Sequence, residues 1–224
     1  MYEVQHCRSD HLPDAIYQQM SSFIRLVWLS HLKGEDRFWV LVDPTGHIDH
    51  FYVAERGVLI SHACVNTRTV THAGESVVLR GLGAVFTYPA FRGEGYARQV
   101  VQAATDFILQ GDADVGMLFC AESLVSFYAS CGWTKLSTPQ IAFGDPAAPH
   151  FNPDECVMML YLSEKGKAAR AEFEQQPVFP AAGDDMQPSP KLLQGPLVAP
   201  QPAAFLGGQQ PAGDQFGPRR AQPG

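Results

Sequence analysis

A segment from Val85 to Ala97 has the composition of an anion-binding turn set between a strand and a helix. Gly93 and Gly95 lie where the turn must expose its backbone amides. The helix that follows points its unpaired amides and the positive end of its dipole at whatever fills the turn. Arg92 adds a fixed cation, and Gly95 lets the backbone approach a ligand without a Cβ clash. The segment therefore predicts a main-chain site for an anion such as a pyrophosphate.

Two other phosphate-binding loops differ from this turn at defined positions. A P-loop requires a lysine after its glycines, and Glu94-Gly95-Tyr96 contains none. A dinucleotide fingerprint requires a third glycine, which both Gly81-x-Gly83 and Gly93-x-Gly95 lack. A glycine-rich turn that only begins a helix remains an alternative, because such turns are common.

A second stretch reads Leu-Val-Ser-Phe-Tyr-Ala-Ser-Cys-Gly-Trp from Leu124 to Trp133. The pattern Arg-x-x-Gly-x-Ala at residues 92–97 resembles the acetyl-CoA motif of the GNAT acetyltransferase family, and residues 124–133 are similar to that family's second motif. Both motifs occur in the family's order and together cover roughly residues 80–136. The resemblance implies a single mixed α/β (α+β) domain with a mostly antiparallel, splayed mixed sheet flanked by helices.

The resemblance also implies acetyl-CoA as co-substrate, with no metal. Main-chain groups of Val85, Phe86 and Thr87 would bond the pantetheine arm between two splayed strands. An amide near Val85 or Phe86 would polarise the thioester carbonyl. Gly81 and Gly83 would allow a bulge in that strand. The pyrophosphate would be held by Arg92 and by the amides of Gly93, Glu94, Gly95, Tyr96 and Ala97.

Tyr128 lies where the family often places a general acid for the departing thiolate. The alternative is a tyrosine that only packs beneath the short helix. The base that removes the amine's proton is unassigned, because residues 79–85 contain no carboxylate and Gly83 stands where relatives carry one. A second departure is Ala121, where relatives often have an asparagine. The candidates for the base are Glu75, His62, Glu122 and Glu55.

The resemblance implies a primary amine as acceptor. Residues 60–65 and the ending of the second motif look similar to aminoglycoside 2′-N-acetyltransferases, which suggests a small-molecule, aminoglycoside-like amine. The acceptor pocket is expected from the first helix and from the loops at 34–36 and 137–154, where Glu35, Asp36, Asp145 and Asp154 would attract a cation. Alternatives are a peptide or protein amine, a longer acyl donor, and an acyl-CoA-binding regulatory module without turnover.

Composition excludes several classes of function. The net charge of −7 argues against binding to nucleic acid through phosphate neutralisation. The five cysteines are widely spaced and predict neither a disulfide framework nor a zinc site. The polar N-terminus lacks the order of a signal peptide, and no apolar run is long enough to span a membrane. We therefore expect a cytoplasmic protein with no membrane partner, and a homodimer remains open.

The chain divides near residue 176. Residues 177–224 hold 10 of the 17 prolines and 7 of the 20 glycines, so we expect a disordered Pro/Gly/Gln-rich tail after a folded domain at 1–176. In the domain, Asp10 is expected to cap a first helix that has Pro13 near its first turn. A second helix is expected from Ala97 to Ile108 and a short one over 123–130. The expected strands are 2–8, 38–42, 51–54, 58–66, 67–71, 77–79, 82–87, 115–119, 133–136 and 157–162.

Overall fold

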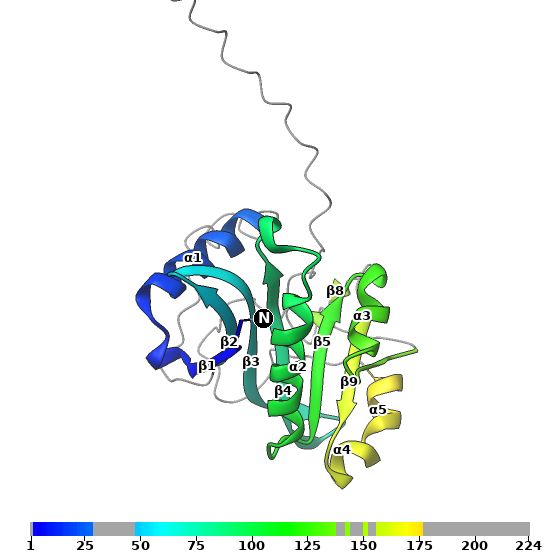
Figure 1. Ribbon diagram of the computed structural model, residues 1–224. Coiled ribbons are helices and arrows are strands. Elements are labelled where there is room, and N and C mark those ends of the chain that lie inside the picture. Colours follow the sequence, from blue (N-terminus) through cyan, green and yellow to red (C-terminus); the bar gives the residue numbers. More distant parts are fainter. Residues whose placement is uncertain (1, 29–47, 138–141, 144–149, 152–155, 177–224) are drawn as a thin grey trace, which may run out of the picture.

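The computed structural model describes residues 2–28, 48–137, 142–143, 150–151 and 156–176 (Figure 1). Its main body is a seven-stranded mixed sheet in the order β1-β2-β3-β4-β5-β9-β6, antiparallel except between β4 and β5. The strands are β1 (Gln5–Arg8), β2 (Ile48–Glu55), β3 (Val58–His72), β4 (Glu75–Thr87), β5 (Val115–Cys120), β6 (Thr134–Lys135) and β9 (Cys156–Tyr161), and the small separate pair is β7 (Ala142–Phe143) with β8 (His150–Phe151). The α-helices are α1 (Asp14–Val27), α2 (Tyr96–Leu109), α3 (Val125–Ala129), α4 (Glu164–Ala168) and α5 (Arg170–Gln175). The predicted mixed fold is confirmed.

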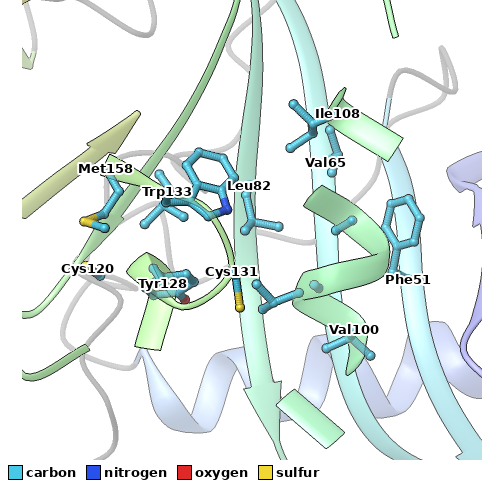
Figure 2. Close-up of a cluster of buried hydrophobic side chains, with 14 of the residues drawn as sticks. Phe51, Val65, Leu82, Val100, Ile108, Cys120, Tyr128, Cys131, Trp133 and Met158 are labelled. Carbon is cyan, nitrogen blue, oxygen red and sulfur yellow. The ribbon is translucent and has the colours of Figure 1, made fainter. Parts of the chain in front are cut away.

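Helices cover both faces of the sheet. On one face, α1 buries Ile16, Met20, Phe23 and Ile24, which recur at helical spacing. On the other face, α2 and α3 pack against β2–β5 and β9, and Figure 2 shows this cluster around Leu82, Val100, Trp133 and others. Helices α1 and α2 each bury one apolar stripe against the sheet, so the sheet is the shared middle layer of the core.

The β3–β4 hairpin is longer than the sequence predicts. We expected breaks between residues 66 and 67 and between 79 and 82, but both strands are continuous. Their pairing runs through the expected breaks, with Asn66 opposite Gly81 and Thr67 opposite Arg80. A tight turn joins the two strands at the tip of the hairpin, with Ala73 and Gly74 both at positive φ. Ladder hydrogen bonds between the strands therefore outweigh the local cost of glycine in β4.

The start of α1 corrects a second prediction. Asp10 does not cap the helix: it lies in a 3-10 turn (Ser9–His11), and its carboxylate bonds His11 at 2.9 Å. The helix begins after Pro13, and Asp14 supplies the acidic side chain of the first turn. A proline at this position fixes φ and removes an amide that would lack a partner.

Asp114 fastens the lower end of the sheet to the C-terminal helices, which the sequence did not predict. Its carboxylate accepts hydrogen bonds from the Val78 amide at 2.9 Å and from the Ser163 hydroxyl at 2.6 Å. Its carbonyl accepts from Leu162 at 2.9 Å. Gly166 packs so tightly here that a Cβ would lie 2.0 Å from the same carbonyl oxygen. The link joins β4, β5 and the start of α4.

Some predictions concern residues outside those that the structure describes. They are the strand at 38–42, the acidic loop residues at 35, 36, 145 and 154, and the tail at 177–224. Among the helices described, none combines the length and apolar character required to cross a bilayer. In the same ranges, His, Cys, Asp and Glu side chains do not gather in groups of three suited to a metal ion.

Candidate active site

The parallel strands β4 and β5 form a fork. They pair only from Leu79–Val115 to Gly81–Met117, although β4 continues to Thr87 and β5 to Cys120. Over the unpaired stretch β5 remains paired with β9. The fork therefore leaves one edge of β4 without a strand partner, as the predicted splay requires.

A β-bulge interrupts the other edge of β4 at the same level. His62 pairs with Phe86 and Cys64 with Gly83, so β4 carries one extra residue relative to β3. Ala84 takes φ 47°, a left-handed conformation that is unusual for alanine. The expected bulge at Gly81 and Gly83 thus falls one residue beyond Gly83. Its effect on the side chains is plain, because Leu82 packs with α2 whereas Ala84, two residues further along the strand, packs with α1.

The turn after β4 has the strand–turn–helix form that the sequence predicts. Gly93 has φ 83° and Gly95 φ 84°, and Gly95 is the N-cap of α2. No side chain caps the first amides of this helix, and a Cβ on either glycine would meet nothing within 4 Å. Arg92 Nε donates to the Thr87 carbonyl at 3.1 Å, which fixes the turn to the end of β4. Open amides at a helix start form a cradle for an anion.

A cavity of about 490 Å³ connects this turn with the fork, α3 and the end of α1. The predicted cofactor residues Val85, Phe86, Thr87, Arg92, Gly93, Gly95, Tyr96 and Ala97 all line it, whereas Glu94 does not. The Tyr96 side chain is buried and stacks on Tyr2, with ring centroids 6.1 Å apart, so this residue offers mainly its backbone. The structure thus brings most of the predicted donor residues to one cavity.

Aromatic side chains of α1 and β4 line the part of the cavity that we call its aromatic end. Phe23 stacks on Phe86 with ring centroids 4.3 Å apart, and Trp28 meets Phe86 edge-on at 6.5 Å. Trp28 packs against the core cluster beneath α1 and also lines the cavity. None of the described lining residues is acidic, and the charged ones are Arg92 and Arg98. This end therefore suits an apolar or aromatic group.

Tyr128 both packs in the core and reaches the cavity. Its side chain lies among the residues drawn in Figure 2, is only 2% exposed, and lines the cavity beside Leu124 and Phe127. Burial, together with Cys120 and Cys131, raises the pKa of its hydroxyl. The phenol therefore keeps its proton at neutral pH.

The end of the second motif explains how Tyr128 is held. The backbone carbonyl of Tyr128 accepts hydrogen bonds from the amides of Cys131 at 2.9 Å and Trp133 at 3.2 Å, where the chain leaves α3. The Trp133 indole donates to the Thr105 hydroxyl of α2 at 3.0 Å. The motif thus anchors the tyrosine to the helix that also carries the anion-binding turn.

The candidates for the base lie outside this cavity. Glu75 begins β4 and is roughly 40 Å from Thr87 along an extended strand. Glu55 lies at the β2–β3 turn beside Arg56. Glu122 bonds Cys156 and Lys135, which lower the pKa of its carboxyl. None of the three lines the cavity.

His62 is fully buried behind Phe86, and both of its ring nitrogens are engaged, one by the Ala84 carbonyl and one by His50. It therefore has no nitrogen available to an amine in the cavity. His50 is a residue that sequence reasoning missed. Predicting that the two histidines meet would have required the register of β2 and β3, which places His50 opposite Cys64 and near His62.

Comparisons with known proteins agree with this fold. The family model described as acetyltransferase (GNAT) domain matches residues 10–136. The structure is similar to ElaA from Escherichia coli (16% identity, 71% of this chain and 99% of that one, TM-score 0.51). It is also similar to NAA60 from Arabidopsis thaliana in complex with a bisubstrate analogue (10% identity, 72% and 99% coverage, TM-score 0.51). At these identities the likeness concerns the fold alone. No curated protein sequence matches the chain.

Proposed function

Because the chain belongs to the GNAT acetyltransferase family, and so is an acyltransferase, we propose that it moves an acetyl group from acetyl-CoA to the primary amine of a small molecule. The observation that carries the proposal is the single cavity shared by the anion-binding turn, the fork and Tyr128. A pyrophosphate, an extended arm and a thioester require these three features in this order along one ligand. Attack occurs directly within a ternary complex.

The main chain of the described site would hold the donor. The open amides at Gly93–Ala97 suit a pyrophosphate, and Arg92 stands beside them. The unpaired stretch of β4 offers main-chain groups of Val85, Phe86 and Thr87 to an amide-containing arm. A backbone N–H beside the bulge would stabilise the negative charge that develops on the thioester oxygen.

The chemistry needs a nucleophile and a leaving group. The amine nitrogen forms a bond to the thioester carbon, the carbon–sulfur bond breaks, and the sulfur leaves as thiolate. Tyr128 donates its hydroxyl proton to that thiolate and regains one from solvent. The proton lost by the amine passes to water, since the described lining offers it no carboxylate or histidine.

The aromatic end of the cavity favours an amine that carries an apolar group. Phe23, Trp28 and Phe86 provide flat apolar surface there. A polycationic aminoglycoside would need carboxylates, and the described lining residues include none. We therefore rank arylalkyl or alkyl amines above aminoglycosides and peptide amines as acceptors.

The second candidate function is an acyl-CoA-binding module without turnover. It is favoured by the same lack of a carboxylate or histidine in the described lining. The two candidates differ in one measurement, which is release of free thiol from acetyl-CoA in the presence of amines.

The experiment measures acetyl-CoA affinity by calorimetry and thiol release with a panel of an arylalkylamine, an alkylamine, an aminoglycoside and a peptide with a free N-terminus. We expect micromolar binding and the highest kcat/KM with the arylalkylamine. Tight binding with no thiol release from any amine would support the module. Absence of binding would contradict both functions.

A further inference from the structure

A chain of buried hydrogen bonds links the protein surface to the bulge in β4. The His62 Nδ1 lies 2.9 Å from the Ala84 carbonyl oxygen, and the His62 Nε2 lies 3.0 Å from the His50 Nδ1. The His50 Nε2 lies 3.0 Å from the hydroxyl of half-buried Ser9. The 3-10 turn at Ser9 and the neighbouring strands β2, β3 and β4 therefore meet through two imidazole rings.

The chemistry of its inner end gives the chain a direction. A carbonyl oxygen only accepts, so the His62 Nδ1 must carry a hydrogen and donate. In a neutral ring the His62 Nε2 then accepts, which requires the His50 Nδ1 to donate. The His50 Nε2 is left to accept from the Ser9 hydroxyl, whose single hydrogen then goes to His50 at 3.0 Å rather than to the Ile48 carbonyl at 3.2 Å. Both histidines thus adopt the Nδ1–H tautomer.

Burial keeps both rings neutral. His50 is 1% exposed and His62 0%. Burial lowers the pKa of His50 to about 3, aided by His62 and His6, and it lowers the pKa of His62 to about 4. The tautomer assignment therefore holds at neutral pH.

The inner end of the chain falls where β4 has lost its regular partners. The ladder with β3 skips Ala84 and Val85, and the pairing with β5 ends at Gly81. A side chain, rather than a neighbouring strand, thus supplies the hydrogen bond to the Ala84 carbonyl. Ala84 also holds a left-handed φ of 47°, which an alanine keeps only when its surroundings fix it.

We propose that His62 is a positioning residue which, held by His50 and Ser9, fixes the Ala84 bulge and so aims the adjacent main chain at the thioester carbonyl. The inference rests on the proposed function, because it concerns the same carbonyl. His62 itself touches no reacting atom, since Phe86 lies between it and the cavity.

The test compares two variants of His62. His62→Phe keeps a planar ring but removes both nitrogens. His62→Asn places an amide N–H where Nδ1 was and keeps the donor to Ala84. The readouts are kcat, the Kd of free CoA, which has no thioester carbonyl, and the infrared band of bound acetyl-CoA carrying ¹³C at the carbonyl.

In His62→Phe we expect kcat to fall roughly 10- to 100-fold. This is less than the loss caused by removing an oxyanion donor altogether, because the donor is displaced but still present. The carbonyl band should move toward its frequency in water, while the Kd of CoA stays within about twofold, since the turn provides the grip on phosphate. His62→Asn should recover most of kcat and of the band position.

His72→Phe is the matched control. It removes another buried histidine of β3, one that stacks on Phe173 with centroids 4.2 Å apart, far from the bulge. We expect it to alter stability only. An unchanged band and kcat in His62→Phe would overturn the proposal, as would equal changes in His72→Phe.

A measurement on the unaltered protein covers the case in which His62→Phe does not fold. Long-range ¹H–¹⁵N NMR should report the Nδ1–H tautomer for both His50 and His62, and acetyl-CoA should shift the His62 Nδ1–H signal more than CoA does. An Nε2–H tautomer at His62 would overturn the proposal. Failure of the wild type to bind acetyl-CoA or release thiol would instead refute the proposed function.

Discussion

The two ends of the cavity are built in different ways. The donor end is made of main chain from one contiguous segment, 85–97, where open amides follow two glycines at positive φ. The aromatic end is made of side chains, with Phe23 and Trp28 from α1 and Phe86 from β4. Backbone chemistry is the same for every sequence that adopts the turn, whereas the aromatic end can change with each substitution. One end is thus suited to a constant ligand and the other to a variable one.

The largest effect should come from closing the main-chain cradle. Gly95→Val forces a branched side chain into a left-handed conformation and directs it into space that is open in the structure. We expect CoA affinity to fall at least about 100-fold, or roughly 3 kcal/mol, as measured by calorimetry.

Gly74→Val controls for backbone strain in this test. Gly74 has φ 83° and equally open surroundings, but it lies at the distant β3–β4 turn. This variant should lose about 1–2 kcal/mol of stability and bind CoA normally. Equal CoA affinity in the two valine variants would contradict the proposed cradle.

Tyr128→Phe should separate chemistry from binding. Because a thiolate leaves readily, we expect kcat to fall about 10- to 100-fold without abolition, and KM for acetyl-CoA to change little. Tyr161→Phe, which removes a buried hydroxyl elsewhere in the sheet, serves as the comparison and should leave kcat unchanged. A kcat for Tyr128→Phe equal to that of the wild type would exclude the general-acid role.

The two buried histidines should make stability depend on pH. Their ordinary pKa is 6.5, but in the folded protein they stay neutral down to about pH 4. The unfolded chain therefore binds more protons, and the free energy of unfolding falls as pH decreases. Between pH 7 and pH 6 the two should remove about 1.4 kcal/mol.

Urea unfolding at both pH values measures this loss. The double variant His50→Gln/His62→Asn should show a smaller difference between pH 7 and pH 6, because neither replacement takes up a proton. The same difference in the variant and the wild type would assign the pH dependence to other groups.

The smallest effect on function should come from a substitution at the aromatic end of the cavity. Phe23→Leu removes the ring stacked on Phe86, so we expect KM for an arylalkylamine to rise about fivefold, near 1 kcal/mol, with CoA affinity unchanged. Leu26→Ala changes an exposed side chain of the same helix and should alter neither value. A loss of CoA affinity in Phe23→Leu would show that the two ends are not independent.

What the sequence predicted depends on how local each feature is. The turn and helix at 85–109 and the second motif follow from neighbouring residues, and the structure has them as strand, turn and helix. The bulge was expected at glycines, and it falls at Ala84 because a side-chain hydrogen bond from β3 outweighs the preference of alanine for negative φ.

Features that depend on long-range pairing were missed. His50 meets His62 only through the register of β2 and β3. Helix α5 adds a single fully buried side chain, Phe173, which gives too weak a periodic signal to predict the helix. The roles of the predicted catalytic and cofactor residues stay predictions until they are tested as above.

The link at Asp114 has a mechanical consequence for the fork. It bonds β4, β5 and the Ser163 segment at the end where the two parallel strands are still paired. A ligand bound between the unpaired ends of the two strands can therefore separate them further only if both strands bend about this fixed end. The stiffness of the Asp114 link would therefore limit the width of the gap between the strands. The link would do so without touching the ligand that occupies the gap.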